Sequence, residues 1–145
     1  MSGIVVGIDG SRNATGALEW AVKEAALRKT QLTVLTVHSV PASYWTGNPT
    51  PFPGDEERVA EIRKAAEATV ASVAEKLGSE RPESITVTAV NGFPAQALID
   101  ASKDSDLLVV GTRGGGGFGP LVLGSVSNQV VHHASCPVVV VPTGK

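Results

Sequence analysis

Short apolar runs alternate with longer amphipathic segments along the chain. Runs rich in β-branched residues predict five strands, at 4–8, 32–37, 85–90, 107–110 and 137–141. Between them, apolar residues recur every three to four positions, which is typical of helices. The expected helices run from Ala14 to about Lys29, from Val59 to Leu77, from Pro94 to about Ala101, and from Ser125 to about Ala134.

This order of elements predicts the α/β fold class. Strands that alternate with helices form right-handed crossovers, so we expect one open, doubly wound, Rossmann-like parallel sheet of five strands with helices on both faces. With 145 residues and no internal repeat or linker, the chain is expected to form a single domain over residues 1–145. The clean alternation at 85–90 favours a half-exposed strand near a sheet edge. The Pro-rich segment 39–54 shows no periodicity and is expected to be a surface loop.

Composition removes several classes of function. Apolar residues make up 42% of the chain, and the formal net charge of −2 comes without a basic patch, so nucleic acid and anionic membranes are not expected as partners. No apolar stretch approaches the roughly 20 residues that cross a bilayer, and no leader is recognisable, so we expect a cytoplasmic protein. The lone Cys136 is interpreted as a buried structural thiol, and the adjacent His132 and His133 as a poor metal pair.

Polar or glycine-rich segments follow two of the predicted strands. Asp9-Gly10-Ser11 follows the first strand, and a glycine-rich loop that begins at Gly111 follows the fourth. Ligands of open parallel sheets sit at the carboxyl ends of strands, where the strand order reverses. If the first and fourth strands are neighbours, both segments face one crevice.

The glycine-rich loop has the features of a phosphate site. Gly114 and its neighbours allow backbone amides to turn inward, and the loop returns at Gly124 to the start of a helix, where free amides and the helix dipole favour anions. The hydroxyls of Ser125 and Ser127 add donors, and Arg113 adds charge. From the residues alone, a flexible surface loop with Ser125 as a helix cap is an equal alternative.

The spacing Gly111-x2-Gly114-x9-Gly124-Ser125 resembles the phosphate-binding pattern G-x2-G-x9-G-[S/T] of ATP-binding universal stress proteins. The segments Val6–Ser11, Leu123–Ser127 and Cys136–Pro142 are also similar to that family, so the resemblance covers nearly the whole chain. It implies the strand order 3-2-1-4-5 and a nucleotide-dependent stress or signalling module.

The resemblance also implies an ATP site, with Mg or Mn bound through the phosphates. Asp9 would approach the nucleoside, with Gly7 making room beneath it, and Val37 would line the adenine pocket. Val110 and Gly111 would flank the ribose and adenine. The phosphates would be held by Gly114, Gly124, Ser125, Val126 and Ser127, with Arg113 and, at lower rank, Gly117 as further candidates.

Enzyme motifs are not found in the sequence. The loop holds no Walker A lysine, no G-x-G-x-x-G follows the first strand, and the acidic cluster of a response-regulator receiver is missing. Asp9 and Arg113 are the only charged groups near the expected phosphates, so no catalytic residue is assigned. The alternatives are a slow ATPase or autophosphorylating enzyme on the same fold, and a dimeric stress protein that binds no nucleotide.

The last strand suggests a partner. Val138, Val139, Val140 and Val141 are apolar on both faces, and the order implied by the resemblance places this strand at a sheet edge without a guarding charge. We therefore expect a homodimer in which this strand pairs with its copy antiparallel about a two-fold axis, as in many members of the family.

Overall fold

A computed structural model describes residues 3–9, 14–39, 55–111 and 124–142. Five strands alternate with four helices: β1 (Ile4–Ile8), α1 (Ala14–Arg28), β2 (Leu32–Ser39), α2 (Asp55–Leu77), β3 (Ile85–Gly92), α3 (Pro94–Ser102), β4 (Leu107–Gly111), α4 (Ser125–His133) and β5 (Val138–Val141). The strands form one sheet in the order β3-β2-β1-β4-β5, and every neighbouring pair is parallel. The predicted fold class and strand order are confirmed.

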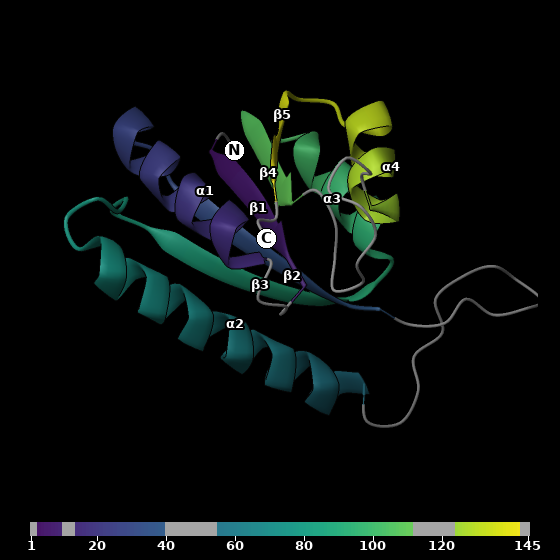
Figure 1. The fold of residues 1–145 in the computed structure, drawn as a ribbon. Coiled ribbons are helices and arrows are strands. Elements are labelled where there is room, and N and C mark those ends of the chain that lie inside the picture. Colours follow the sequence, from purple (N-terminus) through teal and green to yellow (C-terminus); the bar gives the residue numbers. More distant parts are fainter. Residues whose placement is uncertain (1–2, 10–13, 40–54, 112–123, 143–145) are drawn as a thin grey trace, which may run out of the picture.

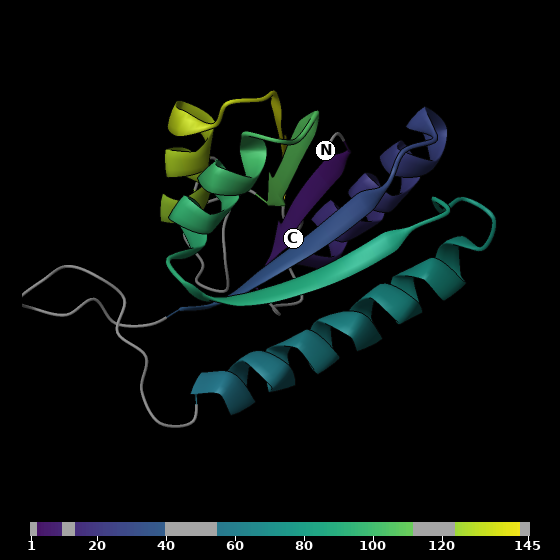
Figure 2. The same cartoon turned by 180° about the vertical axis from the view of Figure 1, so that it is seen from behind.

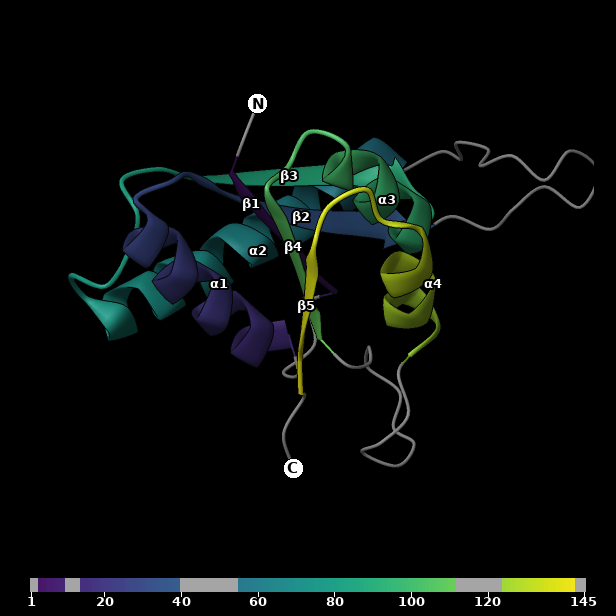
Figure 3. The same ribbon diagram turned by 90° about the horizontal axis from the view of Figure 1, so that it is seen from above.

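Helices cover both faces of the sheet. α1 and α2 lie on one face, whereas α3 and α4 lie on the other (Figures 1 and 3). Because side chains alternate along a strand, β1 serves two cores. Its residues Ile4, Val6 and Ile8 belong to the cluster under α1 and α2, and Val5 belongs to the cluster with α3 and α4.

The strands β2 and β3 extend further than the periodicity indicates. β2 runs to Ser39 and β3 to Gly92, because their parallel ladder continues through the pairs His38–Asn91 and Ser39–Gly92. Backbone pairing needs no apolar side chain, so these polar ends carry no signal in the sequence. Figure 2 shows α2 lying along the same side of the molecule as β2 and β3.

The expected exposure of the third strand is confirmed. β3 is an edge strand, and its side chains from Ile85 to Val90 are half-buried or exposed. By contrast, β1 and β4 lie inside the sheet, and Leu108 and Val109 are fully buried. Within the described part of the chain, no helix combines the length and apolar character needed to cross a membrane.

Candidate functional site

The carboxyl ends of β1 and β4 part from one another. Their ladder runs from Ile4–Leu107 to Val6–Val109. Beyond it, β1 pairs with β2 through Ile8–Thr36, while β4 pairs with β5 through Gly111–Val141. This is the point where the strand order reverses, which is where open α/β sheets bind ligands. The expected adjacency of the first and fourth strands is confirmed.

Asp9 directly follows β1 at this edge and is exposed. Two residues earlier, Gly7 lies against α3: a Cβ atom at Gly7 would stand 2.7 Å from Leu98 Cδ2 and 2.9 Å from Leu98 Cδ1. Leu98 is itself 5% exposed. Gly7 therefore lets α3 approach β1, and the space that the resemblance assigned to a nucleoside is filled here by the side chain of Leu98.

The amino end of α4 faces the same edge with backbone donors. Gly124 is the N-cap (φ −67°, ψ 164°), no side chain among the described residues caps the helix, and Ser125 is the first helical residue. The first intrahelical bond runs from the Asn128 amide to the Gly124 carbonyl oxygen at 2.9 Å. Helix geometry leaves the amides of the first turn without intrahelical acceptors, and the dipole makes this end attractive to anions. The interpretation of Ser125 as the helix cap is therefore wrong, because Gly124 holds that position.

Ser127 links this helix to β4. Its side chain is 5% exposed, and its Oγ donates a hydrogen bond to the carbonyl oxygen of Gly111. A hydroxyl carries one hydrogen, so the donor that was expected to serve a phosphate is used within the protein. Ser125 differs, because it is exposed at the helix start.

The remaining predicted residues divide into two groups. Val110, which is only 3% exposed, belongs to the core cluster beneath α3 and α4, and the half-buried Val37 and Val126 pack against that cluster. Arg113, Gly114 and Gly117 lie outside the described residues.

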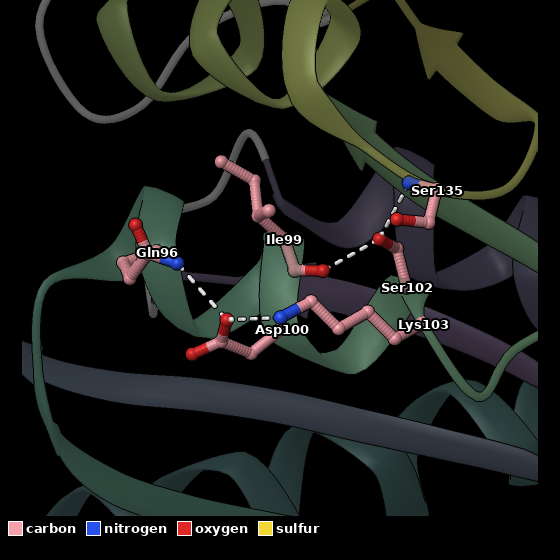
Figure 4. A network of polar contacts seen from close by, with 6 residues as sticks. All are labelled: Gln96, Ile99, Asp100, Ser102, Lys103 and Ser135. Atoms are coloured by element: carbon pink, nitrogen blue, oxygen red, sulfur yellow. Dashed lines mark hydrogen bonds and ion pairs between the residues drawn. The ribbon is translucent and has the colours of Figure 1, made fainter.

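A polar network that the sequence did not reveal fixes the other end of α4. The Ser135 amide donates to Ser102 Oγ at 2.9 Å, and this hydroxyl donates to the Ile99 carbonyl oxygen at 2.6 Å (Figure 4). Ser102 is 1% exposed and lies at the end of α3. On the exposed side of α3, Asp100 Oδ1 accepts a hydrogen bond from Gln96. In the sequence, the one available signal of this network was Ser102, a serine at a core position of a helix.

A hollow lies at the amino-terminal ends of the strands, opposite the candidate site. It has a volume of about 230 Å³ and is lined among others by Gly3, Gln31, Thr33 and Asp104. It is remote from the carboxyl ends of the strands, so it plays no part in the candidate site. Within the described ranges, no group of three or more His, Cys, Asp or Glu side chains is arranged to hold a metal ion.

Comparison with known proteins gives consistent matches. The model of the universal stress protein family matches residues 1–142. A universal stress protein of Mycolicibacterium smegmatis is 36% identical over 139 residues, which cover 96% of this chain and 47% of the relative. The chain thus spans about half the length of the curated relatives it matches.

Solved structures agree in fold. The universal stress protein UspA of Lactobacillus plantarum superposes with a TM-score of 0.70 at 26% identity, covering 97% of both chains. A universal stress protein solved in complex with cAMP gives a TM-score of 0.67 at 28% identity, covering 99% of this chain and 98% of that one.

Proposed function

Because the chain belongs to the universal stress protein family, we propose that it binds ATP at the carboxyl ends of β1 and β4 and acts as a nucleotide-dependent stress or signalling module. The observation that carries this proposal is the amino end of α4. Its first turn has no side-chain cap from any residue that the structure describes, and Ser127 holds it against the end of β4. Uncapped amides at a helix start are donors suited to a phosphate.

The donors available at this edge fit the parts of a nucleotide. The phosphates would lie on the amides of Gly124, Ser125 and Val126, with the exposed hydroxyl of Ser125 adding a donor. Asp9 would approach the nucleoside from the end of β1, with Val37 toward the adenine. On the sequence motif, we assign further phosphate contacts to Gly114, Arg113 and Gly117 and place Gly111 beside the ribose and adenine. We expect Mg or Mn to arrive with the nucleotide.

The relative solved with cAMP supports the ligand class. It covers nearly the whole of this chain, and cAMP shares the adenine, ribose and phosphate of ATP. The choice of ATP within this class comes from the glycine spacing, which resembles the phosphate-binding pattern of ATP-binding universal stress proteins.

We propose binding without efficient turnover. Hydrolysis needs a base beside the attacking water and cationic groups near the leaving phosphate. Asp9 and Arg113 are the charged residues assigned to this site, and Asp9 is placed toward the nucleoside. Nucleotide bound to the purified protein should therefore be recovered largely as ATP, which chromatography of the released nucleotide measures over time. Rapid, saturable release of phosphate would instead make the protein an ATPase.

Calorimetric titration with ATP tests the site directly. Ser125→Ala removes one hydrogen bond to a charged group, worth about 1.5–3 kcal/mol, so ATP affinity should fall by about 10- to 100-fold. Gly114→Val places a branched side chain where the phosphates must approach and should abolish measurable binding. The matched control is Ser135→Ala, an exposed serine just beyond the other end of α4, which should bind as the wild type does.

The pattern of losses decides the result. Unchanged ATP affinity in both Ser125→Ala and Gly114→Val would exclude the proposed phosphate site. An equal loss in Ser135→Ala would show that general disturbance of α4 is responsible.

A further inference from the structure

At the candidate site, a hydrogen bond joins the end of β4 to the start of α4. Ser127 Oγ, in the first turn of α4, donates to the carbonyl oxygen of Gly111, the last residue of β4 and 16 positions earlier in the chain. Ser127 is 5% exposed and the bond is partly buried, so it is worth more than a fully exposed one. It fixes the start of a helix relative to the end of a strand inside the sheet.

We propose that Ser127 is a positioning residue, which sets the place of the phosphate-facing amides of α4 and so determines how strongly the site prefers a phosphorylated nucleoside over the bare nucleoside. This inference rests on the nucleotide-binding function proposed above. It assigns Ser127 a role other than the direct phosphate contact that the family resemblance implied.

The geometry separates positioning from direct contact. The single hydroxyl hydrogen of Ser127 is given to Gly111, so it is not available for a phosphate oxygen. Its neighbour Ser125 is exposed at the helix start and can turn its hydroxyl toward a ligand. Without the Ser127 hydroxyl, the first turn of α4 would lose its described polar link to β4. The amides would then be free to shift, and anion binding depends on their placement.

α4 has a second anchor that provides a control. At its far end, the Ser135 amide is held by Ser102 Oγ, and Ser102 is 1% exposed (Figure 4). Ser102→Ala in α3 and Ser127→Ala in α4 each delete a buried serine hydroxyl, and each removes a hydrogen bond that anchors one end of α4. Only Ser127 lies at the edge where β1 and β4 end.

The test compares wild type, Ser127→Ala and Ser102→Ala in two measurements. Calorimetry gives the affinities for ATP and for adenosine, and hydrogen exchange of the nucleotide-free protein follows the Asn128 amide, which bonds Gly124 across the first turn. In Ser127→Ala, ATP affinity should fall about tenfold while adenosine affinity stays unchanged. The Asn128 amide should also exchange faster. Ser102→Ala should keep the wild-type ratio of the two affinities.

Several results would overturn the proposal. If the ratio of ATP to adenosine affinity is unchanged in Ser127→Ala, Ser127 has no positioning role. If the ratio falls equally in Ser102→Ala, the effect is not specific to Ser127. A fall in ATP affinity with unchanged Asn128 exchange would make Ser127 a direct ligand instead. A wild-type protein that binds neither ATP nor adenosine would refute the proposed function itself, and the positioning role with it.

Discussion

Gly7 shows how one residue can be singled out by sequence and explained differently by structure. It matches a family motif beside Asp9, which suggested room for a nucleoside. In the structure, the Leu98 side chain of α3 fills that room, so glycine is required for close helix–strand packing. A sequence motif cannot separate these two reasons, because both demand a missing side chain.

Gly7→Ala should therefore destabilise the fold whether or not a ligand is present. The added Cβ would meet both Leu98 methyl carbons at less than 3.0 Å, and overpacking of this kind costs about 1–3 kcal/mol. Urea denaturation measures the loss. The matched control is Gly16→Ala in α1, where a Cβ meets nothing within 4 Å. This control should be neutral or slightly stabilising, since alanine favours helices. Equal stability of Gly7→Ala and wild type would contradict the packing role.

Cys136 is more exposed than its sequence suggested. It was expected to be buried, but it is half-buried in the turn before β5. Partial burial raises the pKa of its thiol, and the negative charge of Asp106 raises the pKa further. The thiolate, which is the reactive form, is therefore scarce at neutral pH.

The pH dependence of alkylation should reflect this raised pKa. The rate of modification of Cys136 by iodoacetamide should rise at higher pH than for an unperturbed cysteine. Asp106→Asn removes the nearby charge and should move the profile to lower pH, while the amide oxygen can still accept the hydrogen bond from Gly3. Mass spectrometry of the modified protein follows the rate. A profile that stays in place or moves to higher pH would rule out the effect of Asp106.

At the scale of elements, periodicity predicted every strand and helix in the described part of the chain, but only some of their limits. The ends of β2 and β3 depend on the ladder between them, as His38 and Asn91 show. The start of α4 at Ser125 was predicted, but its cap was not, because only backbone dihedral angles separate Gly124 from Ser125 as the N-cap. The bond between Ser102 and Ser135 spans 33 positions and forms only after tertiary packing.

The anchor between α3 and α4 should contribute measurably to stability. Ser102→Ala removes the acceptor of the Ser135 amide, and the loss of one partly buried hydrogen bond costs about 0.5–1.5 kcal/mol. Thermal unfolding should show a lower midpoint. Ser135→Ala keeps the backbone amide and the bond, so its midpoint should match the wild type. If Ser102→Ala unfolds at the same midpoint temperature as the wild type, the network of Figure 4 does not stabilise the helix pair.

At the scale of the whole molecule, the sheet has two edges of different character. β5 is predicted and observed to be apolar on both faces: Val139 and Val141 pack beside α1, and Val138 and Val140 pack beside α3 and α4. All four valines are half-buried. Among the described residues, β5 pairs only with β4, which leaves one row of backbone groups for a partner. We propose that a second copy pairs there.

Charges on β5 should then prevent dimerisation. Val139→Lys with Val141→Lys would place two like charges along the proposed seam, and the protein should become monomeric in analytical ultracentrifugation. Lysines at Thr86 and Thr88 on β3, the opposite edge strand, form the matched control and should leave the dimer intact. A wild type that remains monomeric at high concentration would exclude this assembly.

The central claim is that ATP binds where β1 and β4 end, and amide NMR spectra of the nucleotide-free protein titrated with ATP test it most directly. The account predicts saturable shifts centred on Asp9, Gly111 and the first turn of α4, from Gly124 to Ser127. It would be contradicted by a spectrum that ATP leaves unchanged. It would also be contradicted by shifts centred on Gln31 and Asp104, at the amino-terminal ends of the strands.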